Sequence, residues 1–430
     1  MNFNNRSVLI IGHTLPEPKT TAAGVRMMQL ISFFQSHNAV VHFATAAGTA
    51  NNAHAEDLSQ IGILVHQLIL NDDGVDAVLD ACRPDIVLFD RFMTEEQFGW
   101  RIRAHSPAAI TILDTEDLHF LRKARQTAFE NNRSLDIYTD LSKRELSSIW
   151  RCDVSLIISK FEYHWLQETF GVPDTLLFYW PIVFEAPTSP RQSFAQSSDF
   201  VCVGNLNHAP NLDAVQWLIN DLWPQIENQL PGVLLHICGA YGREGQVRHW
   251  SKTRGVVVHG WVADIDQVLS TSRVNLAPLR FGAGLKGKIL HALEMGLPTL
   301  TTPIGAEGIT NGQDQVPCIA ETDHDMIQRA VALYQDHHLW QSQQVMGQEL
   351  IKVSFNKAHF YEMFTAHMSL VAHDITAHRQ RHFLGQVFQH QTLYASKYMG
   401  RWLTLKEQLS TQSVQDKYVG IDKKQAIDKK

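Results

Sequence analysis

Short hydrophobic runs recur along the first half of the chain, and each is followed by a loop and a stretch with helical spacing. The first run, SVLIIG at 7–12, stops at a glycine, as buried parallel strands commonly do. Helical spacing begins after a loop with two prolines, where Thr20 or Thr21 is placed to cap the helix. Four more runs continue the series at 39–46, 85–90, 109–114 and 154–159. Strands that alternate with helices predict a doubly wound α/β domain over residues 1–185.

The alternation breaks at residues 185–199, EAPTSPRQSFAQSSD, which are rich in Pro, Ser, Gln and Ala. We interpret residues 186–199 as an interdomain linker. A second series of hydrophobic runs follows, at 200–205, 233–239, 255–260, 274–279 and 298–303. It predicts a second doubly wound domain over residues 200–355. Two such Rossmann-like domains in tandem face a cleft, and ligands bind beyond the carboxyl ends of their strands.

The remainder of the chain is mostly helical and rich in His and Gln. We expect residues 356–430 to form a helical segment that returns to the first domain and ends in a tail, IDKKQAIDKK. One helical stretch carries aromatic and basic residues, namely Phe383, Tyr394, Tyr398, Arg401 and Trp402. Two interpretations of this stripe remain open: a docking surface for the first domain, or weak contact with a membrane surface.

Composition narrows the class of protein. The chain has 430 residues, of which 44% are hydrophobic and 19% charged, as in ordinary globular proteins. Its formal net charge of -7 does not favour nucleic acid as the main partner. The apolar run near the start is too short for a signal peptide, and no stretch approaches the length of a membrane span. We therefore expect a cytoplasmic protein, at most peripheral to a membrane.

The cysteines give a second indication of the compartment. They are odd in number and scattered, without paired spacing: Cys82, Cys152, Cys202, Cys238 and Cys318. Most lie in hydrophobic runs, which is typical of reduced thiols in the core of a cytosolic protein rather than of disulfides or a zinc site.

The candidate chemistry lies in RFGAGLKGKILHALEMGLPTLTTPIGAEGI, residues 280–309. Two glycines, Gly282 and Gly284, allow the backbone to approach a ligand closely. The predicted helix at 286–295 directs its free N–H groups at that ligand, and Lys286 and Lys288 add positive charge. The pattern predicts a site for a diphosphate.

The same helix has two distinguishable faces. Ile289, Leu290 and Leu293 form the stripe that we expect to be buried, whereas Lys288 and His291 share another face. Gly296 ends the helix.

Two other motifs were weighed. GAGLKGKI fits the start of a phosphate-binding Walker A loop, but Ile289 stands where that loop needs Ser or Thr to hold magnesium. DID at 264–266 has the form of a metal-binding motif, although Asp264 is also placed to cap the following helix. The cap is the interpretation that we favour, and no metal site is predicted.

The order and spacing of the motifs resemble a known family, the retaining nucleotide-sugar-dependent glycosyltransferases of family 4 (glycosyl transferases group 1). The resemblance is strongest over residues 200–309, through VGNLNHAPNLDAVQWL, LLHICG, VVHGWVADIDQVLSTSRVNLAPLRFGAGLKGKIL and ALEMGLPTLTTPIGAEGI. The first half matches more loosely. This resemblance implies the GT-B fold and a metal-independent enzyme of polysaccharide biosynthesis. It implies no cofactor, since a nucleoside-diphosphate sugar is the co-substrate.

The resemblance also implies roles for individual residues of the second domain. The implied donor-binding residues are Arg280, Gly282, Gly284, Lys286, Lys288, His291, Glu294, Gly305 and Glu307. His291 stands where the family carries a glutamate that binds the ribose hydroxyls, and Ala283 stands where many members carry a second acid. Both are departures from the family pattern. A neutral imidazole can still make one hydrogen bond to a ribose hydroxyl.

In the first domain the resemblance covers two short segments. AAGVR at 22–26, with Ala23, Gly24 and Arg26, occupies the place of the loop that meets the donor phosphates and the acceptor. Glu116 and Asp117 match a His–Asp pair on the acceptor side and are the implied catalytic residues. The alternatives are a helix start built of small residues for the first segment and a helix cap for the second.

These features together predict a glycosyltransferase that moves a sugar from a nucleoside diphosphate to a hydroxyl of a glycan or a lipid-linked sugar. Arg280, Lys286, Lys288 and the glycine backbone would stabilise the departing diphosphate. Two alternatives remain: a non-catalytic GT-B partner protein that lost the ribose-binding acid, and a nucleotide-sugar epimerase.

Overall fold

The computed structural model describes residues 2–48, 54–185, 193–310, 316–390, 395, 398–400, 402–403 and 405–406. Residues 186–192 of the predicted linker lie outside this part of the chain, as do Tyr394 and Arg401. The chain forms two compact units, Met1–His378 and Arg379–Lys430. None of the described helices combines the length and the hydrophobicity that are needed to cross a membrane.

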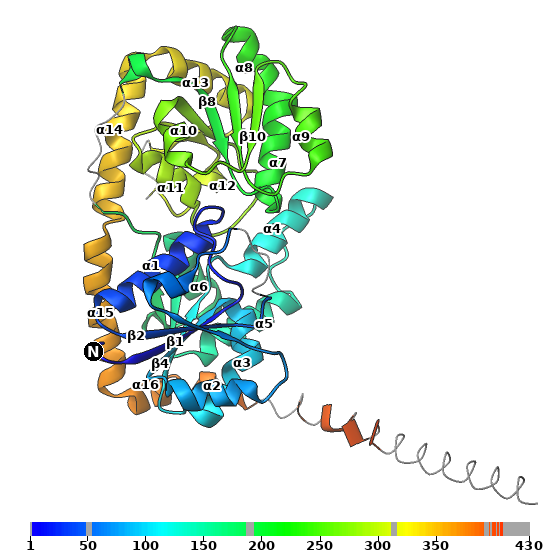
Figure 1. Cartoon of the computed structure of the whole chain (residues 1–430). Helices are drawn as coiled ribbons and strands as arrows, with labels where there is room; N and C mark the ends of the chain where they lie inside the picture. The colour runs from blue at the N-terminus through cyan, green and yellow to red at the C-terminus, as the bar shows by residue number, and fades with distance from the viewer. Residues whose placement is uncertain are drawn as a thin grey trace, which may run out of the picture. The chain divides into compact units, whose positions relative to one another are not determined.

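The first unit contains a seven-stranded parallel sheet in the order β3-β2-β1-β4-β5-β6-β7 (Figure 1). Its strands are β1 (Ser7–Gly12), β2 (Val40–Thr45), β3 (Leu64–Gln67), β4 (Ile86–Asp90), β5 (Ile110–Asp114), β6 (Val154–Ile157) and β7 (Leu177–Tyr179). Five of them coincide with the predicted hydrophobic runs. The pattern misses β3 and β7, because β3 is a partly exposed edge strand that contains His66 and Gln67, and β7 has only three residues.

A second parallel sheet follows, with six strands in the order β10-β9-β8-β11-β12-β13. Its strands are β8 (Ser198–Val203), β9 (Leu235–Cys238), β10 (Val256–Gly260), β11 (Ser272–Ala277), β12 (Thr299–Thr301) and β13 (Cys318–Ile319). Only the two-residue strand β13 was not predicted. Two doubly wound α/β domains are therefore present, and the predicted fold class is confirmed.

The strand order reverses between β1 and β4 in the first sheet and between β8 and β11 in the second. At such a point the connecting helices leave on opposite faces of the sheet, which opens a crevice at the carboxyl ends of the strands. The loops after these four strands carry most of the candidate site.

Helices cover both faces of each sheet. They are α1 (Ala22–Ser36), α2 (Gly74–Cys82), α3 (Arg91–His105), α4 (His119–Asn131), α5 (Asp140–Arg151), α6 (Lys160–Phe170), α7 (Ala209–Trp217), α8 (Trp223–Gln229), α9 (Glu244–Trp250), α10 (Ile265–Thr271), α11 (Gly287–Glu294), α12 (Pro303–Ala306), α13 (Asp323–Gln335), α14 (His337–Ser354), α15 (Lys357–His373), α16 (Ile375–Arg381) and α17 (Phe383–Gln389). Thr21 caps α1 and Asp264 caps α10, because each side chain accepts a hydrogen bond from a backbone N–H in the first turn.

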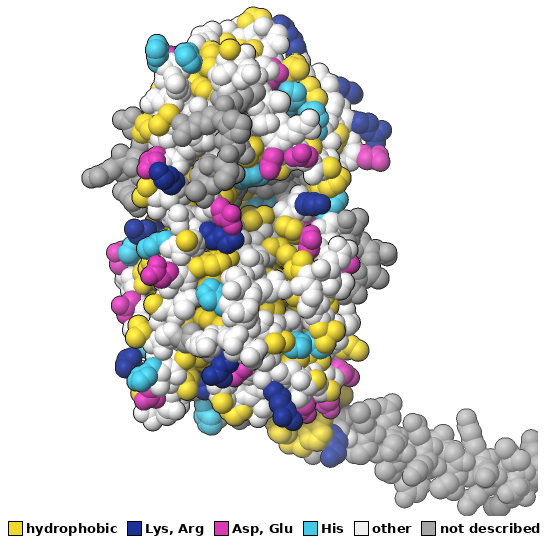
Figure 2. Space-filling model, turned by 60° about the vertical axis from the view of Figure 1, so that its left-hand side comes forward, with side chains coloured by type: hydrophobic (Ala, Val, Ile, Leu, Met, Phe, Trp, Pro, Cys, Tyr) yellow, Lys and Arg dark blue, Asp and Glu magenta, His cyan; other side chains and the backbone are white. Residues whose placement is uncertain are grey.

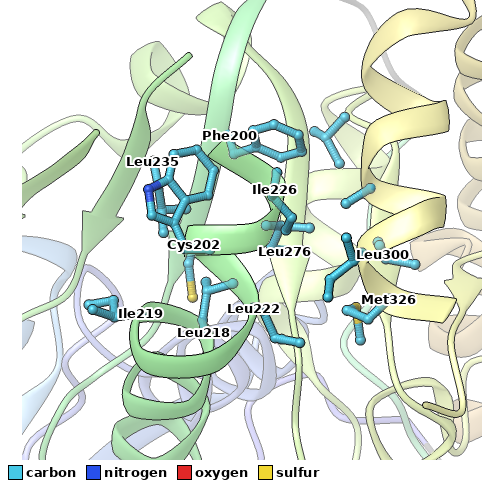
Figure 3. Packing of buried hydrophobic residues seen from close by; sticks show 14 of the residues in the cluster. Phe200, Cys202, Leu218, Ile219, Leu222, Ile226, Leu235, Leu276, Leu300 and Met326 are labelled. Carbon is cyan, nitrogen blue, oxygen red and sulfur yellow. The ribbon is translucent and has the colours of Figure 1, made fainter. Parts of the chain in front are cut away.

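The core of the second domain lies between its sheet and the helices on one face (Figure 3). Phe200 and Leu235 from the strands pack against Leu222 and Met326 from the helical segments, and all four are fully buried. Trp223 is also buried and satisfies its indole N–H by donating to the carbonyl oxygen of Arg254 at 3.0 Å. All five cysteines are buried free thiols, as the sequence predicts.

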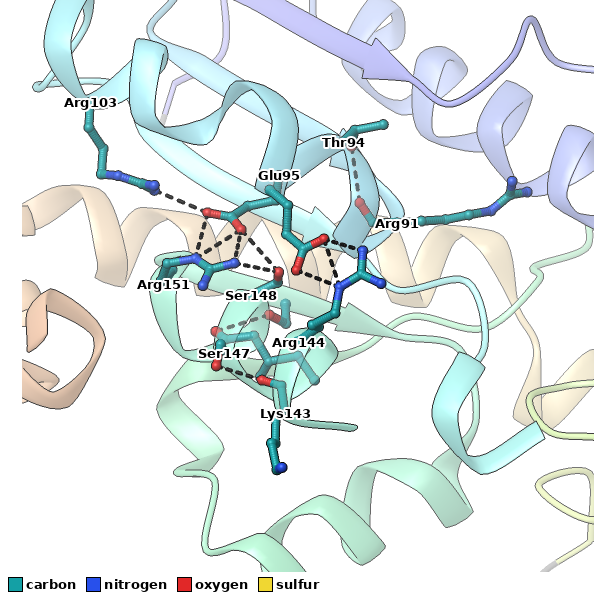
Figure 4. Close-up of polar contacts among 12 residues, drawn as sticks. Arg91, Thr94, Glu95, Arg103, Lys143, Arg144, Ser147, Ser148 and Arg151 are labelled. Carbon is teal, nitrogen blue, oxygen red and sulfur yellow. Dashed lines mark hydrogen bonds and ion pairs between the residues drawn. The ribbon is translucent and has the colours of Figure 1, made fainter. Parts of the chain in front are cut away.

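A buried ionic network joins α3 to α5 in the first domain (Figure 4). Glu95 of α3 is fully buried and accepts hydrogen bonds from Arg151 Nε at 3.0 and 2.9 Å, from Arg103 at 3.1 Å and from the Ser148 hydroxyl at 3.0 Å. Burial of a carboxylate is tolerated here because several donors replace the lost water. The network fixes α3, the helix that begins at Arg91 beside the candidate site.

The chain after the second domain passes back to the first. Ile351 and Phe355, in and just after α14, pack against Ile289 and Leu290 of α11. Phe364 of α15 then enters the hydrophobic core of the first domain (Figure 1).

Charged side chains of both signs are interspersed on the face that Figure 2 shows. Within the second unit, Phe383, Tyr398 and Trp402 of the aromatic and basic stripe have exposed side chains.

Candidate active site

The loop between β11 and α11 passes close to the first domain. Gly284 has φ +67°, and its N–H donates a hydrogen bond to Glu162 Oε1 at 2.7 Å. A Cβ atom at position 284 would lie 2.6 Å from the Cβ atom of Asp117, so a side chain does not fit there. At Gly284 the backbone of the second domain therefore comes close to Glu162 and Asp117 of the first domain.

Lys286 lies buried just before α11 and donates a hydrogen bond from Nζ to the carbonyl oxygen of Gly284 at 2.8 Å. Loss of hydration lowers the pKa of Lys286 to about 8, and the carboxylates of Glu307 and Glu162 oppose this shift. The Lys286 ammonium group thus offsets the negative charge of Glu307 and Glu162 where the two domains meet.

Lys288 is held toward the loop that follows β8. Its Nζ donates to Asn211 Oδ1 at 2.7 Å, and the amide of Asn211 donates in turn to the carbonyl oxygen of Asn205 at 2.9 Å. Burial lowers the pKa of the Lys288 ammonium group. Lys288 therefore joins the starts of α7 and α11, the helices that follow β8 and β11, where the strand order reverses.

His291 has a partner that the sequence interpretation missed. Its Nε2 lies 2.8 Å from Oδ1 of Asp266 in α10, and this hydrogen bond lowers the pKa of Asp266. Lys288 and His291 thus contact different partners, Asn211 and Asp266. Glu294 is half-buried one turn further on, and burial raises its pKa. Asp266 belongs to the DID segment, which was considered only as a metal motif or a cap.

Arg280 is already engaged within the second domain. Its guanidinium makes a bidentate contact with Asp213, at 2.6 and 2.9 Å. It also lies over the rings of Trp217 and Phe129, 5.0 and 4.8 Å from the ring centroids. A direct contact of Arg280 with a diphosphate would have to compete with Asp213.

Glu307 connects the two domains rather than remaining available to a ligand. Arg125 of α4 binds both of its carboxylate oxygens, at 2.7 and 2.8 Å, and donates a further hydrogen bond to the carbonyl oxygen of Gly282 at 2.8 Å. Gly305 is buried in α12, two residues before Glu307.

Ala23 and Gly24 lie in the first turn of α1. The N–H of Gly24 donates to the Thr21 hydroxyl at 2.9 Å, and a Cβ atom at this glycine would lie 2.3 Å from the backbone of Glu17. The small residues are thus required for close packing of the preceding loop. This agrees with the alternative interpretation of the segment as a helix start built of small residues. Ala22 also lies close to Gly287 at the start of α11. A Cβ atom added at Gly287 would be 3.0 Å from the Cβ atom of Ala22.

Arg26 does not lie in this loop. It is fully buried, its guanidinium pairs with Asp114 at 2.7 Å, and it also donates to the carbonyl oxygen of Trp180. The expected contact of Arg26 with a donor phosphate does not agree with this position. Its physical role is to neutralise Asp114 inside the first domain.

Glu116 and Asp117 follow β5 at its carboxyl end, and Glu116 has φ +62°. Only 8% of Glu116 is exposed, and its Oε1 has no hydrogen-bond partner among the described residues. Burial, with Asp114 adding to it, raises the pKa of Glu116 to about 8. Burial also opposes ionisation of Asp117, but Arg122, at 3.0 Å, helps to hold that pKa below its ordinary value. The pKa of Glu116 is thus raised while the pKa of the adjacent Asp117 is lowered.

The loops after β1 and β4 add residues that the sequence interpretation did not name. The N–H of His13 donates to Asp90 Oδ2 at 2.9 Å, and Arg91, with φ +69°, lies 3.6 Å from the other carboxylate oxygen. Burial alone would lower the pKa of Arg91, but Asp90 and Glu116 outweigh it, so the guanidinium stays charged. His13 and Arg91 directly follow predicted strands, but the hydrophobic pattern does not show that these two strands lie side by side.

His208 reaches the same region from the second domain, where its Nε2 lies 3.2 Å from Arg122 Nη1. Burial lowers the pKa of His208 to about 4, so its imidazole is neutral at pH 7. The loops at both points of strand reversal therefore meet in one group of charged and polar side chains. We call this group the interdomain cluster; it comprises Arg91, Glu116, Asp117, Arg122, Glu162, His208, Asn211, Lys286 and Lys288.

The comparisons with known proteins bear on the family and on the fold. Residues 197–336 match the family model described as "Glycosyl transferases group 1". No curated protein sequence matches the chain.

Three solved structures illustrate the likeness of the fold. Sucrose-phosphate synthase from Thermosynechococcus elongatus has a TM-score of 0.68 at 12% identity, and the match covers 86% of this chain and 100% of that one. The pneumococcal O-GlcNAc transferase GtfA, in complex with UDP and GlcNAc, has a TM-score of 0.63 at 12% identity and 86% and 100% coverage. WaaG, a glycosyltransferase involved in lipopolysaccharide biosynthesis, has a TM-score of 0.57 at 11% identity and 83% and 99% coverage.

The fold is thus that of GT-B glycosyltransferases, and the family match covers the domain that carries the diphosphate loop. The resemblance seen in the sequence is supported by the family match over residues 197–336, and the GT-B fold that it implies is confirmed.

Proposed function

We propose that the chain transfers a sugar from a UDP sugar to a hydroxyl group of a glycan or a lipid-linked sugar in the cytoplasm, with retention of the anomeric configuration. The family match over residues 197–336 supports the reaction class. GtfA binds UDP, which supports UDP as the nucleotide of the donor. WaaG acts in lipopolysaccharide biosynthesis, which supports a glycan or a lipid-linked sugar as the acceptor.

One observation carries the proposal: Lys286 and Lys288 lie where the loop at the second sheet's point of reversal meets the acidic residues of the first domain. Cleavage of the bond between the sugar and the diphosphate builds positive charge on the anomeric carbon and negative charge on the leaving group. Lys288, Lys286 and the N–H groups at the start of α11 would stabilise the leaving diphosphate. No metal is assigned to this step in the proposal.

The ribose would be bound by His291 and Asp266 as a pair. The Asp266 carboxylate can accept hydrogen bonds from ribose hydroxyls, and the His291 ring holds it in place at 2.8 Å. In this arrangement the acid missing from position 291 is supplied by α10, so the substitution of histidine for glutamate does not by itself abolish donor binding.

Glu116 would act on the acceptor side. Its pKa of about 8 allows the carboxyl group to take up or release a proton near neutral pH, which is the property of a group that orients or deprotonates a hydroxyl.

The test is to incubate the protein with UDP-glucose, UDP-GlcNAc and other nucleotide sugars and to measure nucleoside diphosphate release, with Lys288→Ala as the control. The wild type should release UDP faster than the variant. Conversion of the donor to another nucleotide sugar without UDP release would instead indicate an epimerase.

A second candidate function, a non-catalytic GT-B partner protein, is favoured by the engaged state of three predicted donor residues. Arg280, His291 and Glu307 are paired with Asp213, Asp266 and Arg125, respectively. Such a partner would bind nucleotide weakly or not at all and would release no UDP from any of the donors.

A further inference from the structure

Three metal-ligating side chains converge at the outer edge of the first sheet: His42 on β2, His66 on β3 and Cys82 at the end of α2. Nδ1 of His42 lies 3.2 Å from Nε2 of His66, which lies 3.6 Å from Sγ of Cys82. All three ligand atoms lie within 4.8 Å of one another. Over the part of the chain that the structure describes, this is the one group of three His, Cys, Asp or Glu side chains with such convergence. It shares no residue with the interdomain cluster.

The backbone explains why these side chains meet. In the parallel pair β2 and β3, His66 lies opposite Ala44, two residues beyond His42, so both imidazoles project from the same face of the sheet. Helix α2 covers that face, where Val75 and Leu79 are buried together with Cys82. The end of the helix is held in turn, because the carbonyl oxygen of Cys82 accepts a hydrogen bond from the Ser7 hydroxyl at 2.7 Å. The three ligand atoms therefore come from rigid elements.

The spacing agrees with tetrahedral zinc. Zn–N bonds of about 2.0–2.1 Å and Zn–S bonds of about 2.3 Å place two nitrogen ligands about 3.4 Å apart, and a nitrogen and a sulfur about 3.6 Å apart. The observed separations are 3.2 Å and 3.6 Å. The third pair, His42 Nδ1 and Cys82 Sγ, lies within 4.8 Å and would have to be about 3.6 Å apart in a tetrahedral site.

Hydrogen bonding alone accounts poorly for the arrangement. Nε2 of His66 carries either one proton or one lone pair in the plane of the ring, yet it faces both His42 Nδ1 and Cys82 Sγ. One cation can satisfy all three atoms at once.

We propose that His42 Nδ1, His66 Nε2 and Cys82 Sγ bind one zinc ion, with solvent in the fourth position. Nitrogen and thiolate ligands of this kind favour zinc over magnesium or calcium. Both imidazoles are partly exposed, which gives the ion a route from solvent. Binding displaces the proton of the Cys82 thiol: the S–H bond breaks, an S–Zn bond forms, and one proton is released to water. The bound ion ties β2, β3 and α2 together.

The second domain offers a matched control. His236 on β9 and His259 on β10 also face each other, with Nδ1 of His236 2.9 Å from Nε2 of His259. No cysteine completes this pair among the described residues, and the other ring nitrogen of His236 faces Asp199 at 3.6 Å. Both domains therefore contain a pair of facing histidines, but among the described residues only the pair in the first domain has a cysteine thiol beside it.

The test uses the full chain without a polyhistidine tag, stripped of metal with a chelator. Zn²⁺ binding is measured by calorimetry, and Co²⁺ serves as a spectroscopic probe, because a thiolate ligand gives a charge-transfer band. We expect one Zn²⁺ per chain, release of one proton and a thiolate–cobalt band. Cys82→Ser should abolish the band, His66→Gln should weaken Zn²⁺ binding about tenfold or more, and His259→Gln should change neither. Zn²⁺ should also raise the Tm of the wild type but not that of His66→Gln.

Several results would overturn the proposal. They are a stoichiometry of zero, a cobalt band that is absent from the wild type or persists in Cys82→Ser, and equal Zn²⁺ affinities for the wild type and His66→Gln. If Cys82→Ser fails to fold, as judged by circular dichroism, His66→Gln decides the question, since its side chain is half exposed and its replacement disturbs little packing.

Discussion

Burial controls the ionisation of the acidic residues in the interdomain cluster. Glu116 and Glu162 both have their pKa raised to about 8, with burial as the main cause, while Asp117 is held below its ordinary value with the help of Arg122. At pH 7 the first two are largely protonated and Asp117 is ionised. A carboxylic acid and a carboxylate side by side in one loop are well suited to acid–base work.

The first prediction concerns Glu116→Gln. The pKa of Glu116 rises from 4.5 to about 8 in the folded protein, so its contribution to stability is fully present below pH 4.5 and is lost as the pH rises through about 8. Glutamine imitates the protonated acid and never ionises. The variant should therefore gain free energy of unfolding relative to the wild type between pH 5 and pH 8.5, as measured by urea titration. A difference that does not change with pH would contradict the shifted pKa.

The same variant tests the catalytic role of Glu116. It should bind UDP normally yet lose about 10²–10⁴ in transfer rate if Glu116 handles the proton of the acceptor. Wild-type turnover of the donor by Glu116→Gln would mean that the loop is structural.

The second prediction is that Lys288→Ala weakens UDP binding by several-fold to a hundredfold in calorimetry. A charged hydrogen bond to a phosphate contributes about 1.5–3 kcal/mol in a partly closed site. Lys352→Ala is the matched control, because Lys352 is exposed on α14 and lies 3.8 Å from Glu349. Equal affinity in the wild type and Lys288→Ala would remove this lysine from the donor site.

The third prediction concerns His291 and Asp266. In the single variant His291→Glu, the new carboxylate would lie beside the Asp266 carboxylate, which is now 2.8 Å from His291. Repulsion between the two carboxylates should cancel the gain of a new ribose-binding acid. The double variant His291→Glu/Asp266→Asn removes the repulsion and should bind UDP more tightly than the single variant. The readout is the ratio of affinities for UDP and 2'-deoxy-UDP. If this ratio is the same in all variants, neither residue contacts the ribose.

The lysines and glycines at 282–288 could be recognised in the sequence because they follow a strand and precede a helix within a few residues. Their partners could not. Arg125 and Glu162 reach the site only through the packing of the two domains, and Asp266 only through the contact of α10 with α11 inside the second domain. Arg26 was misplaced for the same reason, since nothing local indicates that its charge is neutralised by Asp114, 88 residues later.

At the level of elements, the glycine loop between β11 and α11 makes a close contact with the first domain, and the fourth prediction addresses it. Gly284→Ala introduces a Cβ atom 2.6 Å from that of Asp117 at φ +67°. The control is Gly260→Ala at the end of β10, where φ is +68° and no atom lies within 4 Å of the new Cβ. Gly260→Ala should cost about 1–2 kcal/mol of stability through φ alone.

Gly284→Ala should cost more than this control and should also reduce the rate of UDP release. Equal losses of stability in the two variants, with activity intact in both, would show that the contact with Asp117 does not matter.

Most strands could be predicted because buried parallel strands appear as continuous hydrophobic runs. The exceptions were edge strands. β3 has four residues, none of them fully buried, and β13 has two residues, so neither has a hydrophobic pattern long enough to stand out. The strand order itself is not written in the hydrophobic pattern. For that reason the loops after β1 and β4, with Asp90 and Arg91, were not recognised as part of the site.

At the level of the molecule, the proposed reaction would draw on residues from both domains. Arg125 and Glu307, Glu162 and Gly284, and Arg122 and His208 each join one domain to the other. In the proposed reaction the second domain would bind the donor, while the acids with shifted pKa values, Glu116 and Asp117, belong to the first. The central claim is that a sugar is cleaved from a nucleoside diphosphate between them and moved to a hydroxyl with retention.

Proton NMR of the reaction mixture tests this claim most directly, because the anomeric protons of the donor and of the product give separate signals. With a UDP sugar and a glycan acceptor, we predict that the α-anomeric signal of the donor decays while an α-linked product signal and free UDP appear in equal amounts. Gly284→Ala should slow all three changes together. A donor signal that stays constant with every nucleotide sugar and acceptor supplied would contradict the account, and a β-linked product would contradict retention.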